Sequence, residues 1–169
     1  MGVSHMTQVL TVDDSASTRH LIRLMLEPEG YTVSEASDGL EGLQALRASA
    51  EPTVVLLDYE MPNMTGAELL EVVTESGGAL SHHEFIIVSA HAGTFPVEFI
   101  DILRHLDVRL LPKPFEQQTL VKLVAQAVER MNAPLPEPLP DLSDANQSGG
   151  NGADDGSFDQ GDHTLGDHV

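Results

Sequence analysis

The sequence contains no cysteine and few basic residues, and both absences exclude classes of function. Without cysteine, the chain has neither disulfides nor thiol catalysis. Only 8 Lys and Arg stand against 27 Asp and Glu, which gives a formal net charge of −19. Because no basic patch can replace the counterions of a polyanion, we expect no nucleic-acid and no membrane partner. No signal peptide or membrane-length apolar run is visible, so a cytoplasmic location is expected.

Composition divides the chain into three stretches. Residues 1–5 look like the remnant of an expression vector, which makes Met6 a plausible natural start. Residues 6–131 carry the patterns of one folded domain. Residues 132–169 are acidic, contain no Lys or Arg, and begin with alternating prolines before a run of Gly, Asp and Ser. Such a stretch buries too little apolar surface to offset its ordering entropy, so we predict a disordered acidic tail.

Short apolar runs alternate along the domain with segments whose apolar residues recur at helical spacing. The runs predict strands at 8–13, 31–36, 53–58, 84–89 and 107–111. The helices are expected from Ser17 to before Gly30, around 40–46, over 66–76, around 99–106 and over 120–131. Five strand–helix pairs predict an α/β domain with a doubly wound five-stranded parallel sheet and helices on both faces. The continuous apolar runs belong at its centre, and the alternating second run at an edge.

Polar side chains follow four of the predicted strands at the point where each strand ends. They are Asp13 and Asp14, Asp58, Ser89, and Lys113. Because the carboxyl ends of parallel strands meet at one edge of an open sheet, we expect these side chains to converge. Three carboxylates would repel one another, and Mg²⁺ with oxygen ligands would relieve that repulsion. The alternative is that Asp13 and Asp14 only cap the helix that follows.

Asp58 is the candidate nucleophile of this group. A carboxylate accepts a phosphoryl group as an acyl phosphate, and Mg²⁺ together with Lys113 would neutralise the transferred charge. The hydroxyl of Ser89 would hold a phosphoryl oxygen, although taken alone it would be an ordinary turn residue. Lys113 lies between two prolines, and a cis bond after it would aim its side chain inward. His82 and His83 are interpreted as a solvated loop pair, because no further ligands stand at metal spacing.

Four motifs surround these polar residues, which are Val12-Asp13-Asp14-Ser15 with Arg19, Leu57-Asp58-Tyr59-Glu60-Met61-Pro62 with Gly66, Val88-Ser89-Ala90, and Lys113-Pro114-Phe115. Through these motifs, residues 6–131 resemble the receiver domain of two-component response regulators. The resemblance implies a flavodoxin-like (βα)5 fold with strand order 2-1-3-4-5.

The resemblance also implies a Mg²⁺ site. Asp13 and Asp14 would bind the ion, one directly and one partly through water. Asp58 and the main-chain carbonyl of Glu60 would complete the protein ligands. Asp58 would be the phospho-acceptor, and the donor would be a histidine on a sensor histidine kinase or on a histidine phosphotransfer protein.

The remaining roles concern the switch and its output. Ser89 would be the switch hydroxyl, and Lys113 the lysine that precedes a cis-proline. The family usually carries an aromatic switch partner three residues before this lysine, where the chain has Leu110. Coupling from Ser89 to the face formed by 95–131, which would bind a downstream protein, is therefore expected to differ. Glu60 and His91 flank the acyl phosphate and would tune its hydrolysis.

Several interpretations of the whole chain stay open. The first is a single-domain signalling switch, as in chemotaxis or phosphorelays. The motif at 12–16 favours the chemotaxis-like branch, and Leu110 argues against it. The second is a receiver excised from a larger regulator. A pseudo-receiver that only binds partners would not need the full set of polar residues. An enzyme that transfers phosphate on small substrates would need a cap domain, for which the elements leave no room, so we expect no enzyme beyond the domain's own phosphoryl transfer.

Overall fold

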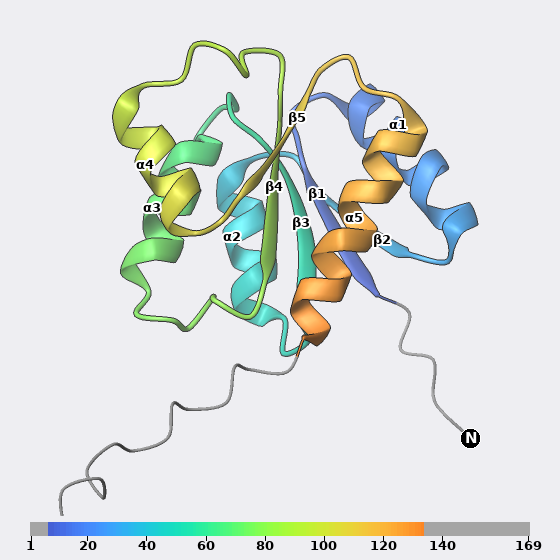
Figure 1. Ribbon diagram of the computed structural model, residues 1–169, viewed down its shortest axis with the longest axis horizontal. Helices are drawn as coiled ribbons and strands as arrows, with labels where there is room; N and C mark the ends of the chain where they lie inside the picture. Colours follow the sequence, from blue (N-terminus) through green and yellow to red (C-terminus); the bar gives the residue numbers. More distant parts are fainter. Residues whose placement is uncertain (1–6, 134–169) are drawn as a thin grey trace, which may run out of the picture. The chain divides into compact units, whose positions relative to one another are not determined.

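The computed structural model describes residues 7–133. The expectations for 1–5 and for the tail from 134 onward lie outside the described residues. Five parallel strands form one sheet in the order β2-β1-β3-β4-β5, which confirms the predicted fold class and strand order (Figure 1). The strands are β1 (Gln8–Val12), β2 (Thr32–Ala36), β3 (Thr53–Asp58), β4 (Glu84–Ser89) and β5 (Arg109–Pro112). The helices are α1 (Ala16–Leu26), the short 3-10 helix η1 (Glu27–Glu29), α2 (Gly39–Ala48), α3 (Gly66–Glu75), α4 (Val97–His105) and α5 (Gln117–Asn132).

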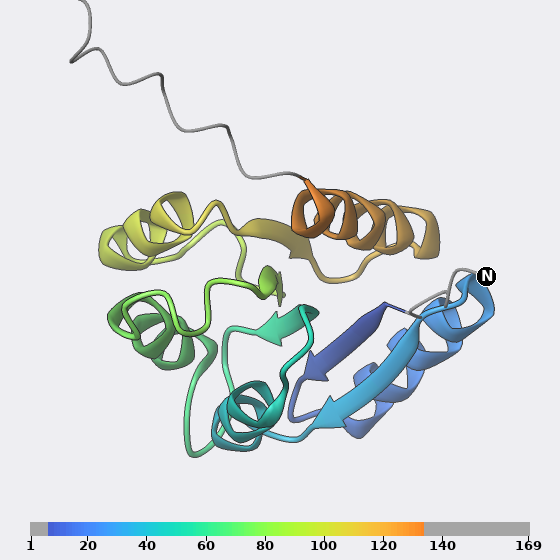
Figure 2. The same cartoon turned by 90° about the horizontal axis from the view of Figure 1, so that it is seen from below.

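Helices cover both faces of the sheet. α1 and α5 lie on one face, and α2, α3 and α4 lie on the other (Figures 1 and 2). Each face has its own buried core, and β3 contributes alternate side chains to both. Val55 and Leu57 pack toward α2 and α3, whereas Val54 and Leu56 pack toward α1 and α5. This two-sided burial explains why the run 54–57 contains no polar residue.

The ends of α3 follow from local sequence signals. Thr65 caps the helix by accepting a hydrogen bond from the backbone N–H of Glu68, whose side chain in turn accepts one from the backbone N–H of Thr65. This reciprocal pair satisfies donors that the first helical turn leaves free. Gly77 and Gly78 follow the helix with φ of 63° and 94°, a backbone region that glycine adopts without steric cost. The predicted closure of this helix by the glycine pair is found.

The last strand begins later than predicted. The sequence pattern places a strand at 107–111, but Asp107 has a φ of 50° and cannot lie in a strand. The backbone N–H of Val108 donates to the carbonyl of Leu103 at 2.8 Å, so Asp107 and Val108 belong to the turn that ends α4. β5 therefore starts at Arg109.

The interpretation of His82 and His83 as a solvated pair is wrong for His83. Its side chain is only 4% exposed, and its ring centroid lies 3.9 Å from that of His82. Burial, together with the neighbouring His82, lowers the pKa of His83 from 6.5 to about 4. His83 is therefore a neutral core residue at physiological pH.

Among residues 7–133, no helix combines the length and the apolar character that a bilayer crossing requires.

Candidate acidic site at the carboxyl edge of the sheet

Strand register brings the ends of four strands to one edge of the sheet. Val12 of β1 pairs with Leu57 of β3, so Asp13 and Asp58 follow at neighbouring positions. On the other side, Ser89 at the end of β4 pairs with Pro112, and Lys113 comes next. The backbone N–H of Lys113 donates to the carbonyl of Ser89 at 2.9 Å, which extends this pairing by one residue.

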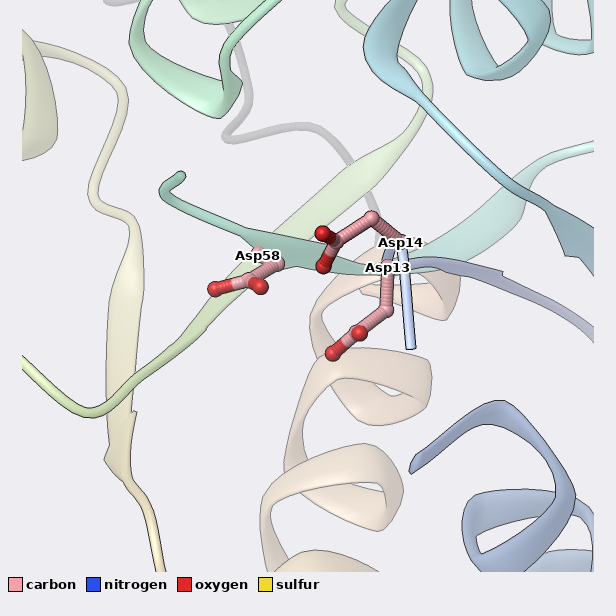
Figure 3. A group of neighbouring side chains, drawn as sticks. All are labelled: Asp13, Asp14 and Asp58. Atoms are coloured by element: carbon pink, nitrogen blue, oxygen red, sulfur yellow. The ribbon is translucent and has the colours of Figure 1, made fainter. Parts of the chain in front are cut away.

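Asp13, Asp14 and Asp58 form a compact group of carboxylates at this edge (Figure 3). One oxygen of each lies within 4.8 Å of those of the other two. The three differ in exposure, since Asp13 is 2% exposed, Asp58 is half-buried and Asp14 is exposed. Burial, reinforced by the charge of Asp13, raises the pKa of Asp58 against the opposing effect of Lys113. The site thus carries more negative charge than its own residues neutralise.

Lys113 is the cation of the site. Its Nζ atom lies 2.7 Å from Asp13 and 3.2 Å from Asp58, and its peptide bond to Pro114 is cis, as the sequence predicts. Burial alone would lower the pKa of Lys113, but the hydrogen bonds and charges of the two aspartates outweigh it and raise that pKa. One ammonium group therefore stays charged between two of the three carboxylates.

Capping does not explain the acidic pair. The cap of α1 is Ser15, whose hydroxyl accepts a hydrogen bond from the backbone N–H of Thr18 at 3.3 Å. Asp13 accepts from the backbone N–H of Ser15 at 2.8 Å, so one of its oxygens serves the turn before the helix. Within the described part of the chain, the carboxylate of Asp14 makes no hydrogen bond or ion pair. Asp14 is thus left available for a ligand.

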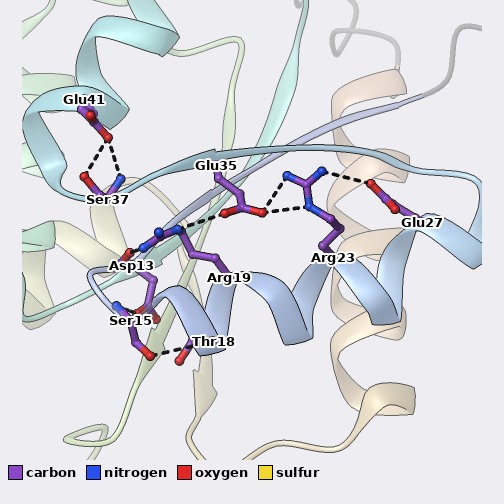
Figure 4. Close-up of polar contacts among 9 residues, drawn as sticks. All are labelled: Asp13, Ser15, Thr18, Arg19, Arg23, Glu27, Glu35, Ser37 and Glu41. Carbon is purple, nitrogen blue, oxygen red and sulfur yellow. Dashed lines mark hydrogen bonds and ion pairs between the residues drawn. The ribbon is translucent and has the colours of Figure 1, made fainter.

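A second cation fixes the backbone of the acidic pair. Arg19 donates through Nη1 to the main-chain carbonyl of Asp13 at 2.6 Å and through Nε to Glu35 at 3.1 Å (Figure 4). Glu35 is also paired with Arg23 at 2.6 Å. The sequence motif contains Arg19, but only the structure gives it this role. The network ties α1 to β2 and holds the loop that carries both aspartates.

Ser89 follows Val88, the β4 residue that pairs with Asp58, and its hydroxyl is engaged in its own turn. Its side chain is 1% exposed, and its hydroxyl accepts a hydrogen bond from the backbone N–H of His91 at 3.0 Å. A hydroxyl in this arrangement keeps its own proton available for donation to an oxygen in the site.

A cleft of about 460 Å³ opens over the carboxylates. His91 and Glu60 face each other at its rim, with Nδ1 and Oε2 3.5 Å apart and both side chains more than half exposed. Leu110 does not line the cleft and is a partly buried residue packed against the core on the α2, α3 and α4 side of the sheet. The cleft is lined by Asp14, Asp58, Glu60, Met61, Pro62, Ala90, His91 and Lys113.

Three aromatic rings connect the site to α4. Tyr59, which follows Asp58 directly, has its ring centroid 4.7 Å from that of Phe95 and 4.8 Å from that of Phe99. The two phenylalanine rings are 5.1 Å apart in an edge-to-face arrangement. The backbone N–H of Tyr59 also donates to the Asp58 carboxylate and opposes the rise in its pKa. Sequence reasoning missed this cluster, because rings at 59, 95 and 99 come from separate elements.

The donor set fits a hard divalent cation. Three carboxylates offer oxygen ligands, one of them exposed and without another partner among residues 7–133, and the one lysine that contacts them leaves part of their negative charge uncompensated. Oxygen donors with room for water and for a phosphate oxygen are what Mg²⁺ prefers. A carboxylate beside such an ion and beside an ammonium group can accept a phosphoryl group.

Comparison with protein families decides the identity of the domain. The family model described as response regulator receiver domain matches residues 9–125. The chain belongs to this family. Receiver domains are phosphorylation-dependent signalling switches that bind Mg²⁺ at an acidic pocket, and this receiver carries such an acidic cluster.

Relatives of this receiver include chemotaxis proteins. It is 32% identical over 114 residues to chemotaxis protein CheY1 of Helicobacter pylori, covering 67% of this chain and 90% of that one. The crystal structure of chemotaxis protein CheY4 of Vibrio cholerae has a TM-score of 0.61 and 28% identity, covering 72% of this chain and 98% of that one.

Other curated relatives are longer proteins. This receiver is 31% identical over 125 residues to the sensor histidine kinase CheAY of Helicobacter pylori, which covers 72% of this chain but only 15% of the kinase. It also spans 53% of a CpxR-homologous transcriptional regulatory protein of Haemophilus influenzae. Receiver domains thus occur alone and joined to other domains, and the match defines the domain rather than a whole protein's activity.

Proposed function

We propose that this receiver is switched by transfer of a phosphoryl group to Asp58 from a histidine of a sensor kinase or of a histidine phosphotransfer protein. The observation that carries the proposal is the position of Asp58, half-buried within 4.8 Å of two further carboxylates and 3.2 Å from the Lys113 ammonium. Similarity to part of a sensor histidine kinase supports a histidine donor. The cytoplasmic location stays a prediction from the sequence.

The reaction is an exchange at phosphorus. An oxygen of Asp58 forms the new P–O bond while the P–N bond to the donor histidine breaks, and the electron pair of that bond stays on the imidazole. Lys113 compensates the negative charge that the phosphoryl oxygens bring, and the Ser89 hydroxyl would donate to one of them.

We further propose Mg²⁺ as the cofactor, held by Asp13, Asp14, Asp58 and the main-chain carbonyl of Glu60. The ion would supply positive charge at the phosphoryl oxygens. Asp14 is the most available ligand, because Asp13 is already bonded to Ser15 and to Lys113. Asp13 would therefore bind through its remaining lone pairs or through water.

At the rim of the cleft, Glu60 and His91 would control how water reaches the acyl phosphate. The two side chains meet 3.5 Å apart and stay largely exposed, so they can move without disturbing the core. Exchange of either residue is expected to change the lifetime of the phosphorylated form more than the rate of its formation.

The output surface would be the face of α4, β5 and α5, within 95–131. With Leu110 in place of an aromatic residue, Tyr59 offers a direct route, because its backbone touches Asp58 and its ring touches Phe95 and Phe99. A change at Asp58 would thus reach α4 through ring packing, and α4 would alter its affinity for a downstream protein.

Phosphorylation at Asp58 is tested by mass measurement. Acetyl phosphate or phosphoramidate with Mg²⁺ is expected to add one phosphoryl group to the wild type and none to Asp58→Asn. Glu71→Gln, which removes an exposed carboxylate on α3, serves as the matched control and is expected to label like the wild type. Equal labelling of Asp58→Asn and the wild type would refute the assignment of the acceptor.

A receiver that belongs to a longer regulator is the second candidate. The observation that favours it is the small share, 15% and 53%, that the chain covers of two of its relatives. The chemistry at Asp58 would be the same, and the partner of α4 would then be a domain of the same protein.

A further inference from the structure

The loop between β3 and α3 forms one wall of the cleft. Glu60, Met61 and Pro62 of this loop line the cleft together with Asp14 and Asp58. Its main chain also carries the Glu60 carbonyl that the metal proposal uses. A main-chain ligand cannot adjust by side-chain rotation, so its position depends on what fixes the loop.

A side-chain hydrogen bond ties this loop to the start of the neighbouring helix α2. The side-chain amide of Asn63 donates to Oδ2 of Asp38 at 2.6 Å. Asp38 is 9% exposed and caps α2, with Oδ1 accepting from the backbone N–H of Glu41 at 2.9 Å. These two hydrogen bonds, from Glu41 first and Asn63 second, hold the pKa of Asp38 below its usual value. Asp38 is therefore a charged acceptor that is fixed on the α2 side and holds the loop on the other.

The main chain of the loop follows the same anchor. Asn63 has a φ of 64°, and the backbone N–H of Gly39 donates to the carbonyl of Met64 at 3.1 Å. A side chain at Gly39 would overlap that carbonyl, so the start of α2 and the loop are in direct backbone contact. At the other end, the backbone N–H of Gly66 donates to the carbonyl of Tyr59 at 3.0 Å, which closes the loop.

We propose that Asp38 and Asn63 are positioning residues of the Mg²⁺ site, which hold the β3–α3 loop so that the main chain at Glu60 is preorganised for the ion. This inference rests on the proposed function. Neither side chain lines the cleft, and both act through the loop. Partners behind metal ligands typically contribute about 10- to 100-fold to metal affinity, so a loss in that range is expected when the contact is removed.

Two variants that conserve the net charge test the proposal. Asn63→Gly removes the amide while glycine accepts the positive φ, so the backbone is not strained. The exchange Asp38→Asn with Asn63→Asp restores a carboxylate–amide pair with its partners reversed, and asparagine is as good a helix cap as aspartate. Ser37→Ala is the control, because it removes a hydrogen bond to Glu41 at the start of α2 without touching the loop.

Mg²⁺ titration of the full chain provides the readout. The chain has no tryptophan and two tyrosines, of which Tyr59 directly follows Asp58, so a change in tyrosine fluorescence on addition of Mg²⁺, assigned by amide chemical shifts around Tyr59, reports binding of the ion. Asn63→Gly is expected to weaken Mg²⁺ binding at least about tenfold, whereas the exchange variant and Ser37→Ala stay within about threefold of the wild type. A merely structural role would lower the thermal midpoint of Asn63→Gly and leave its Mg²⁺ affinity unchanged.

The outcomes separate the two proposals. If folded Asn63→Gly binds Mg²⁺ as tightly as the wild type, the positioning role is wrong and the proposed metal site is unaffected. The same conclusion follows if the exchange variant binds Mg²⁺ as weakly as Asn63→Gly does. If the wild type itself shows no Mg²⁺ binding, the metal part of the proposed function is wrong, and the positioning role falls with it.

Discussion

Asp14 is the residue whose removal separates metal binding from fold stability. Its carboxylate lies within 4.8 Å of those of Asp13 and Asp58, and it has no hydrogen bond or ion pair among residues 7–133. Asp14→Asn therefore relieves repulsion and breaks no contact. Asp13→Asn differs, because Asp13 binds Lys113 at 2.7 Å and the backbone N–H of Ser15 at 2.8 Å.

The expected size follows from the charges. Two carboxylates 4 to 5 Å apart repel by about 1 kcal/mol at the dielectric constant of water, which suits the exposed Asp14. Two such pairs give about 2 kcal/mol, of which the nearby Lys113 charge offsets a part. Without metal, Asp14→Asn is therefore expected to raise the free energy of unfolding by about 1 kcal/mol.

With Mg²⁺ bound, the wild type should become more stable than Asp14→Asn. At an ion concentration of about ten times Kd, binding stabilises the wild type by about 1.4 kcal/mol, and a variant that lacks the most available ligand gains much less. Urea unfolding of both proteins, with EDTA and with Mg²⁺, measures the four free energies. Asp13→Asn should not be more stable than the wild type in EDTA. Glu71→Gln should match the wild type both in its stability in EDTA and in the stability that it gains from Mg²⁺.

Two results would refute this reasoning. If Asp14→Asn is less stable than the wild type in EDTA, its carboxylate has a structural role that the contacts do not show. If the variant and the wild type gain equal stability from Mg²⁺, Asp14 is not a ligand.

Three further outcomes are expected. Beryllofluoride, a mimic of the phosphoryl group on Asp58, should shift the amide resonances of residues 97–105. Phe95→Leu should reduce these shifts by more than half, whereas Phe115→Leu, in the core on the other face of the sheet, should not. Equal shifts in both variants would exclude the aromatic route. Folding lowers the pKa of His83 from 6.5 to about 4, so the unfolded chain takes up the proton at a higher pH than the folded chain. The contribution of His83 to the free energy of unfolding is therefore complete above pH 6.5 and is lost as the pH falls toward 4. Urea unfolding should show a loss of up to about 3 kcal/mol that His83→Phe lacks, and the same loss in that variant would assign it elsewhere. Truncation after residue 133 should leave the thermal midpoint within about 2 °C, and a large drop would show that the tail stabilises the domain.

The sequence by itself determined that five parallel strands form the sheet and which polar groups follow them, whereas the strand order followed from the resemblance to receiver domains. Continuous apolar runs at 54–57 and 85–88 indicate strands buried on both faces, and polar residues placed after such runs meet wherever the strands are parallel. These properties are local or follow from general rules of chain topology. The convergence of Asp13, Asp14, Asp58 and Lys113 at one edge of the sheet could therefore be predicted from the amino-acid sequence.

Only the tertiary structure decided which of these groups bond to one another. Lys113 lies 100 residues from Asp13 in sequence, and its hydrogen bond to Asp13 rather than to Asp14 depends on register and on rotamers. The turn that delays β5, the burial of His83 and the contact between Asp38 and Asn63 likewise arise where separate elements pack. No periodicity within one segment encodes such contacts, because their geometry is set by the elements on both sides at once.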